Sequence, residues 1–352
     1  MSQRSQIPSL SNVLRVNDNV ESVNCQNENK PEFFDENNNS VNYFIDESDE
    51  QYHKIIKKIG EGAASIAYKI VDTRTQKIMC KKVIKVEEGK TTFKDLQNAM
   101  KEFEVLFNIN HPCICHAIGI NTCEVLECDE ETGNEITTVA LFLEFIENSL
   151  SECLSKKLLN NTQKTKIIVE IAQAMSFIHK LGMIHRDLKV DNIMLDSNYD
   201  AKLIDFGLVS INESLYNNYS LTTESKTKGI GTLAFMSPEM LNEEEYDDKT
   251  DVFSFGIVLY YVFIGKIPKY SLKDKINGIP IKLPKASYSI SNFCLSLISK
   301  CLEHKSVKRP TFEDILKEIR KNSYLLAEEV NSNEIAEKDK YLETFKLSYK
   351  KD

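Results

Sequence analysis

Apolar and polar residues alternate in three short segments that follow His53. The segments are 53–62, 67–72 and 77–86, and the turn-forming run 72–75 separates the last two. Alternation of this kind predicts β-strands with one face in a core. Two further strands are predicted near 114–122 and 136–144, joined by the acidic, turn-like segment 129–135. This part of the chain is therefore expected to be rich in β-sheet.

Helical periodicity dominates the remaining chain. The clearest pattern places Ile167, Ile171, Met175 and Ile178 on one face of a helix that Gly182 would end. Other helices are predicted at about 92–108, 248–264, 290–302 and 311–321. A small sheet-rich part followed by a larger helical part predicts an α+β fold with two lobes.

The two ends of the chain differ from its middle. Residues 1–51 are rich in Asn, Ser, Asp and Glu, so they are expected to be a disordered, solvated tail. Residues 323–352 form a charged extension with Tyr341, Phe345 and Tyr349 at a spacing of four. That spacing allows a helix docked on the domain, and a solvated extension is the alternative.

Composition narrows the class of protein. A net charge of −9 over 352 residues argues against a general nucleic-acid binder, which would show a basic face. The nine cysteines show no regular spacing, which indicates free thiols and a reducing compartment. Cys113 and Cys115 are close together but lack the second Cys/His pair that a zinc site needs. No apolar leader is visible, Ser2 does not allow myristoylation, and the run 252–264 is too short to span a membrane. The expected location is the cytoplasm, with the nucleus as the alternative.

Two motifs in the sheet-rich part suit phosphate binding. The run Gly60-Glu61-Gly62-Ala63-Ala64-Ser65 lies between two predicted strands, and glycine lets backbone N–H groups approach phosphate oxygens. Lys81 follows on a later strand and would neutralise phosphate charge. Taken alone, the first motif is more simply a turn and the second a surface lysine.

Two motifs in the helical part carry the chemistry. Residues 184–195 place Asp187, Lys189 and Asn192 between apolar neighbours, where polar groups are costly unless they bind something. Asp205 follows a short apolar strand in Lys202-Leu203-Ile204-Asp205-Phe206-Gly207. Asn192 and Asp205 form an all-oxygen set that suits a hard cation such as Mg²⁺.

In this order and spacing, the four motifs resemble the eukaryotic protein kinase family over about 52–320. The resemblance implies a bilobal kinase domain at 52–322, with an N-lobe at 52–143, a hinge at 144–147 and a C-lobe at 148–322. It implies transfer of the γ-phosphate of ATP, with Mg²⁺ or Mn²⁺, to serine or threonine hydroxyls of protein substrates in signalling. The runs GTLAFMSPEM and CLEHKSVKRPTFEDIL most resemble the tyrosine-kinase-like group of serine/threonine kinases.

The resemblance also assigns the ATP site. Residues 60–65 would cover the phosphates, and Lys81 would contact them while paired with Glu102. Glu104 is the alternative partner, but Glu102 shares a helical face with Leu106. Lys82 should point away from the site. Leu143 resembles the gatekeeper, the backbone of Glu144 and Ile146 would bind adenine, and the ring would lie between Ala67, Met79 and Met194.

The catalytic and activation residues follow in the same way. Asp187 resembles the catalytic aspartate, Lys189 the lysine that holds the γ-phosphate, and Asn192 and Asp205 the metal ligands. The activation segment would begin at Phe206 and Gly207 and close at Ser237-Pro238-Glu239. Glu239 should pair with Arg309, and Asp251 should brace the catalytic loop.

Regulation and acceptor choice are expected from the activation segment. Thr227 is the predicted phosphorylation site. An upstream kinase or the protein itself would phosphorylate it, and the phosphate would pair with Arg186. Thr232 resembles a threonine that bridges Asp187 and Lys189 in serine/threonine kinases, and a local turn is the alternative role.

Three departures from the family pattern are visible: Ser65 replaces a glycine, Phe253 a tryptophan and Met79 an alanine. The rival hypothesis is a pseudokinase that binds without catalysis, but Lys81, Asp187, Asn192 and Asp205 are all present. A small-molecule kinase fits less well, because the SPE and GTLAFM runs resemble peptide-recognising kinases.

Overall fold

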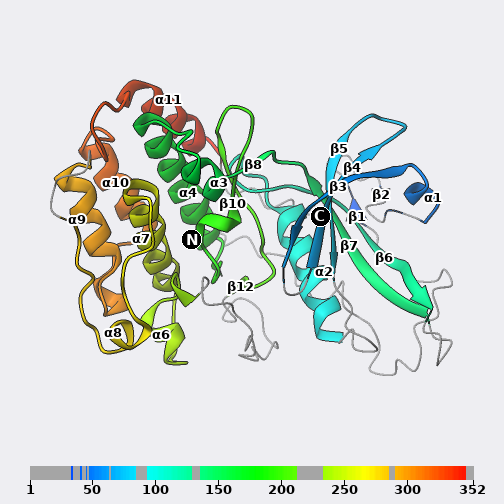
Figure 1. Ribbon diagram of the computed structural model, residues 1–352, viewed down its shortest axis with the longest axis horizontal. Helices are drawn as coiled ribbons and strands as arrows, with labels where there is room; N and C mark the ends of the chain where they lie inside the picture. Colours follow the sequence, from blue (N-terminus) through cyan, green and yellow to red (C-terminus); the bar gives the residue numbers. More distant parts are fainter. Residues whose placement is uncertain are drawn as a thin grey trace, which may run out of the picture. The chain divides into compact units, whose positions relative to one another are not determined.

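The computed structural model describes residues 33–34, 40–41, 45, 47–62, 65–84, 93–128, 135–211, 233–284 and 290–345. Contacts divide these residues into two compact units. The first unit holds the residues up to Asn110 together with His116–Phe145. The second holds His111–Cys115 and the residues from Ile146 onward. Figure 1 shows the elements of each unit in sequence colours.

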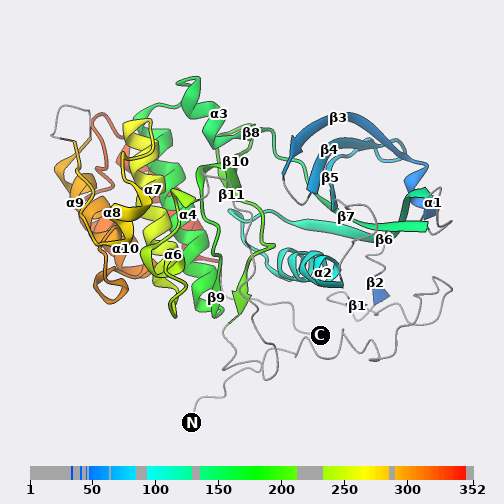
Figure 2. The same cartoon turned by 60° about the horizontal axis from the view of Figure 1, so that its bottom comes forward.

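The first unit is built on a five-stranded antiparallel sheet in the order β3-β4-β5-β7-β6. Its strands are β3 (His53–Glu61), β4 (Ser65–Asp72), β5 (Ile78–Ile84), β6 (Ala117–Cys128) and β7 (Glu135–Glu144). Helix α2 (Phe93–Asn108) lies along one face of the sheet (Figure 2). On the opposite face Ile70, Met79, Val83, Ala140 and Phe142 form an apolar cluster. The predicted strands and helix are all present, and β6 begins and ends later than predicted.

The tail predicted for residues 1–51 contains ordered elements before Tyr52. Strands β1 (Phe33–Phe34) and β2 (Ser40–Val41) pair with each other, and α1 spans Glu47–Glu50. Ile45 packs against the apolar cluster, and its backbone N–H donates to the Ile120 carbonyl. An apolar residue within the polar run thus anchors the chain, and the prediction of disorder up to residue 51 was too long.

The second unit is mainly helical, which confirms the predicted α+β class. Its helices are α3 (Leu150–Ser155), α4 (Asn161–Lys180), α6 (Pro238–Leu241), α7 (Lys249–Ile264), α8 (Leu272–Ile276), α9 (Asn292–Cys301), α10 (Phe312–Lys321) and α11 (Ser332–Glu343). Its short strands are β8 (Asn148–Ser149), β9 (Met183–Ile184), β10 (Ile193–Leu195), β11 (Ala201–Leu203) and β12 (Ser210–Ile211), with a 3₁₀ turn, η2, at Val190–Asn192. No helix within the described ranges is long and apolar enough to cross a membrane.

The charged C-terminal extension forms a docked helix, which settles the two alternatives left by its sequence. Helix α11 lies beside α4 and buries Ile335 and Leu342. The buried Asp339 carboxylate accepts hydrogen bonds from Arg320, at 2.7 Å, and from the Tyr324 hydroxyl, at 2.8 Å. Tyr341 is 51% exposed, and Tyr349 lies outside the described residues. Of the three aromatic residues in the extension, Tyr341 is therefore turned to solvent, whereas the ring of Phe345 lies 6.1 Å from the His111 ring.

A buried carboxylate of α7 holds the loop that follows α4. Asp251 is fully buried and accepts hydrogen bonds from the backbone N–H groups of His185 and Arg186, both at 2.8 Å. The same carboxylate lies 2.9 Å from Nε2 of His179, near the end of α4, and Asp248 lies 3.5 Å from its Nδ1. The predicted brace between Asp251 and the loop backbone is therefore present, with an additional histidine in it.

The ionisation of His179 makes this brace sensitive to pH. Burial lowers the pKa of His179, but hydrogen bonds and charges from Asp248 and Asp251 outweigh it and raise the pKa to about 9. Because the folded protein binds this proton more tightly than the unfolded chain, protonation of His179 stabilises the fold. The stabilisation is complete at pH values below the unfolded pKa of about 6.5. That stabilisation is lost as pH rises through the folded value.

We expect His179→Gln to be most destabilising at pH 6 and less so at pH 9.5. The free-energy difference from wild type should shrink by on the order of 3 kcal/mol between these pH values, because the wild-type imidazolium is lost. Urea unfolding at both pH values measures this difference. His304→Gln, at an exposed histidine, is the control. A difference that stays constant or grows with pH would contradict a charged His179.

Candidate active site

The loop that contains Asp187 gathers two polar side chains of the second unit around the carboxylate of that residue. Nζ of Lys189 lies 2.6 Å from Oδ2 of Asp187. Nδ2 of Asn192 donates to the Asp187 backbone oxygen at 2.8 Å and to Oδ2 at 3.0 Å. Asp187 and Asn192 are buried, and Asn192 ends the 3₁₀ turn η2 that leads into β10. The structure therefore brings together Asp187, Lys189 and Asn192, as the sequence predicts.

Two residues of the site, one directly before Asp187 and the other Asp205, have unusual backbone geometry. Arg186, directly before Asp187, has φ of 66°, and Asp205 has φ of 65°. Residues other than glycine rarely adopt this left-handed conformation, and it persists where surrounding contacts enforce it. The contacts here are the bonds from Asp251 to the backbone around Arg186 and from Ile204 N–H to the Asn192 carbonyl, at 2.9 Å. Such enforced strain is typical of functional sites.

Asn192 and Asp205 fit the predicted magnesium site by their chemistry. The amide nitrogen of Asn192 is turned toward Asp187, which leaves its oxygen as the atom able to bind a cation. No cluster of three or more His, Cys, Asp or Glu within the described ranges could hold a metal ion by itself. Magnesium commonly takes one or two protein oxygens and completes its shell with phosphates and water. The pair thus suits a metal that arrives with a nucleotide.

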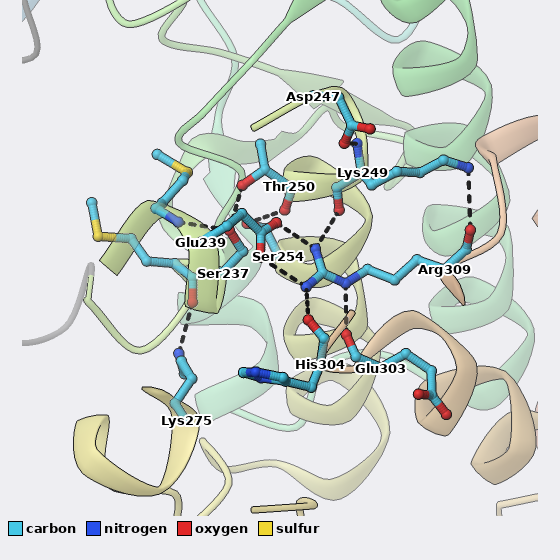
Figure 3. A network of polar contacts seen from close by, with 12 residues as sticks. Ser237, Glu239, Asp247, Lys249, Thr250, Ser254, Lys275, Glu303, His304 and Arg309 are labelled. Atoms are coloured by element: carbon cyan, nitrogen blue, oxygen red, sulfur yellow. Dashed lines mark hydrogen bonds and ion pairs between the residues drawn. The ribbon is translucent and has the colours of Figure 1, made fainter. Parts of the chain in front are cut away.

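Phe206 and the end of the activation segment are fixed by buried contacts. The Phe206 ring is fully buried, 4.9 Å from the His185 ring, and Gly207 follows in a turn. At the other end, Arg309 binds both oxygens of Glu239, at 2.6 and 2.9 Å (Figure 3). This confirms the predicted pair. Thr227 and Thr232 lie outside the described residues.

The predicted lysine–glutamate pair of the first unit is shifted by one residue. Nζ of Lys82, not Lys81, binds both carboxylate oxygens of Glu102, at 2.7 and 2.9 Å. Nζ of Lys81 instead lies 3.2 Å from Glu50 of α1 and 5.7 Å from the centre of the Phe142 ring. Glu102 is therefore the paired glutamate, as preferred over Glu104. Its predicted partner Lys81 was wrong.

The alternation of strand β5 explains this correction. Successive side chains of a strand point to opposite faces, so Lys81 and Lys82 cannot share one. Cross-strand pairing places Lys82 opposite Leu141 and Ala67, and Cys80 opposite Leu143. Met79 points to the other face, within the apolar cluster. Cys80 thus takes the place on the Leu143 face that Met79 was predicted to take.

Cys80 lies on the same face of the sheet as Lys82, the lysine that pairs with Glu102. Burial raises the pKa of its thiol to about 11, and the charges of Lys82 and Glu102 act on it in opposite directions. A thiol with so high a pKa stays protonated and is a weak nucleophile at neutral pH. Cys80 therefore acts as a small apolar side chain on this face of the sheet.

Neither glycine of the predicted phosphate loop is required by the fold around it. Positive φ angles occur at other glycines in the described ranges, and not at Gly60 or Gly62. A Cβ at Gly60 would lie 3.8 Å from the Ala67 side chain, and one at Gly62 would lie 3.8 Å from the Ser65 carbonyl, both ordinary contacts. Glu61 is exposed, and Ala63 and Ala64 lie outside the described residues. The glycines are thus better explained by the close approach of a ligand.

The remaining predicted adenine-site residues occupy strand ends. Leu143 is buried near the end of β7, and Glu144 ends the strand, with its backbone N–H donating to His116 at 3.0 Å. Ile146 is the first residue of the second unit after that strand, and Met194 is the central residue of β10. Sequence reasoning missed Lys82, Cys80 and His179. Only the register of β5 and the packing of α4 on α7 identify them.

Comparison with known proteins agrees with this geometry. The family model described as protein kinase domain matches residues 53–319. A probable serine/threonine-protein kinase of Dictyostelium discoideum is 33% identical over 275 residues, covering 75% of this chain and 27% of that protein. A putative serine/threonine-protein kinase/receptor of Acanthamoeba polyphaga mimivirus is 30% identical, covering 75% of this chain and 15% of that protein. The chain spans about a quarter or less of the length of these relatives. With catalytic-loop residues in place and a match over most of its length, the chain belongs to the protein kinase family.

Proposed function

We propose that this protein transfers the γ-phosphoryl group of ATP to serine and threonine hydroxyls of protein substrates. The observation that carries the proposal is the arrangement of Asp187, Lys189 and Asn192 on a loop that Asp251 braces. A pseudokinase, which only binds, would not need these three side chains. Backbone strain costs free energy, and a protein without catalysis would gain nothing from maintaining it in this loop. A role in intracellular signalling is consistent with the six free cysteines found in the described ranges.

Phosphoryl transfer depends mainly on positioning and on neutralising charge. Asp187 would orient the acceptor hydroxyl and accept its proton. Its Oδ2 already accepts hydrogen bonds from Lys189 and Asn192, which fix the direction of the carboxylate. Lys189 would extend toward the transferred phosphoryl group, where its charge favours the transition state. Magnesium or manganese bound by Asn192 and Asp205 would offset further charge on the phosphates.

The residues of the first unit would hold ATP. Gly60 and Gly62 would let backbone N–H groups approach the phosphates. Lys82 would contact the phosphates, kept in place by both oxygens of Glu102. Ala67, Cys80 and Leu143 share its face of the sheet and, with Met194, would contact adenine. The backbone of Glu144 and Ile146 would supply its hydrogen bonds.

Activation would follow phosphorylation of the activation segment, by an upstream kinase or by the protein itself. Arg186 suits the reception of a phosphate, because its side chain already donates to the Leu208 carbonyl and to the Tyr246 hydroxyl near that segment. Thr227 remains the proposed acceptor. A phosphate there would add a charge-assisted bond to Arg186.

We expect Lys82→Met to lower phosphoryl transfer at least 100-fold, since it removes the charge that Glu102 holds in place. Lys81→Met is the matched control, because it changes the neighbouring lysine on the opposite face of β5. Its transfer rate should stay within a few-fold of wild type, provided that its melting temperature shows it folded. Initial rates at saturating ATP measure both variants. Equal loss in the two variants, or greater loss at Lys81, would overturn the corrected assignment.

We also expect autophosphorylated protein to carry phosphoserine and phosphothreonine with little phosphotyrosine. Lys189 lies beside Asp187, so the acceptor oxygen must approach close to the loop backbone, which suits a short aliphatic hydroxyl. Phosphoamino-acid analysis of radiolabelled protein measures the ratio, and the Lys82→Met protein controls for contaminating kinases. A product dominated by phosphotyrosine would refute the acceptor class and leave the kinase family unchanged.

A further inference from the structure

Lys275 of helix α8 is a buried cation whose donors are all used on one loop. Its side chain is 1% exposed, and its Nζ donates to the carbonyl oxygens of Leu233, Ala234 and Met236, at 3.2, 2.8 and 2.8 Å. An ammonium group has three donors, so these bonds satisfy it completely. No carboxylate within the described ranges forms an ion pair with it.

Side chains from other elements hold the backbone of the segment 233–236. Lys275 binds three of its carbonyl groups, and Oγ of Ser254 on α7 binds the fourth, that of Phe235, at 2.9 Å. Four consecutive carbonyl groups are thus fixed by two side chains. The segment leads directly into Ser237, whose hydroxyl lies 2.6 Å from that of Thr250, and into α6 (Figure 3).

The aromatic environment of Lys275 links it to the Glu239–Arg309 pair. Nζ of Lys275 lies 5.1 Å from the centre of the Phe253 ring, and the Arg309 guanidinium lies 5.0 Å from the same centre. Tyr270 provides a second ring, at 5.8 Å. The faces of aromatic rings attract cations, so Phe253 stabilises both without a carboxylate beside Lys275. Burial lowers the pKa of Lys275 to about 8.

We propose that Lys275 is a positioning residue that fixes the segment 233–236 as the platform on which the protein substrate is bound. The inference rests on the proposed function, because this segment lies at the end of the activation segment, next to the residues that would receive a substrate. A purely structural lysine would be expected to bind an element of the core. Lys275 instead binds the carbonyl oxygens of the segment directly before Ser237-Pro238-Glu239, the run that would close the activation segment.

The test compares Lys275→Met with wild type in steady-state kinetics, varying a serine-containing peptide and ATP separately. Met keeps the apolar stem and removes the donors, which leaves three buried carbonyl groups unpaired. The peptide KM should rise about tenfold or more, while the ATP KM stays within about twofold. Lys273→Met, an exposed lysine of the same helix, is the control and should behave as wild type.

A second variant keeps the test decisive if Lys275→Met unfolds. Lys275→Gln retains two N–H donors, and its peptide KM should lie between those of wild type and Lys275→Met. A folded variant whose peptide KM equals the wild-type value would overturn the inference. So would a fall in apparent kcat that follows the folded fraction while both KM values stay at the wild-type values. Wild-type protein without any phosphoryl transfer would instead overturn the proposed function, and this inference with it.

Discussion

The hydrogen bonds that the Asp251 carboxylate accepts are the interactions on which the second unit depends. It lies in the first turn of α7, where the helix N-terminus favours a negative charge, and it is fully buried. A buried carboxylate costs several kcal/mol unless its oxygens are bonded, so its partners are held strictly in place. Those partners are the backbone at His185 and Arg186 and the ring of His179. The left-handed turn before Asp187 exists because these bonds maintain it.

Helix α7 also organises the end of the activation segment. Thr250 contacts Ser237, Ser254 binds the Phe235 carbonyl, and the carbonyl of Lys249 accepts from Arg309. The catalytic loop and the segment before α6 are therefore fixed to the same helix, within a few turns of each other. Neither has regular secondary structure of its own at these points. Side-chain bonds to backbone groups replace it, which explains the number of buried polar residues in α7.

The sequence predicted most elements because their periodicity is strong. Alternation located β3, β4 and β5, and the apolar spacing of α4 located the longest helix. The catalytic loop could be predicted because its residues are close together in the chain. The Lys82–Glu102 pair could not be predicted, since adjacent lysines in a strand differ only in the face that they occupy, and β5 offers an apolar neighbour on both faces. The register with β4 and β7 decides between them.

Other features depend on contacts distant in sequence. Helix α11 docks through Asp339, whose partners Gln173 and Arg320 lie on α4 and α10. Glu50 of α1 binds Lys81 and Asn121, which lie on two different strands of the sheet. Lys275 sits in a helix of five residues, too short to leave a periodic pattern. In each case a charged residue binds a partner that is distant in the sequence and that the local sequence does not reveal.

The account rests on Asp187 acting as the residue that receives the acceptor proton. The most direct measurement is transfer of labelled γ-phosphate from ATP to dephosphorylated casein in the presence of Mg²⁺, with wild type and Asp187→Asn side by side. The account predicts transfer by the wild type and a loss of about 10²- to 10⁴-fold in the variant, with both proteins folded by thermal melting. A folded wild type that transfers no phosphate, or a variant as active as wild type, would contradict it.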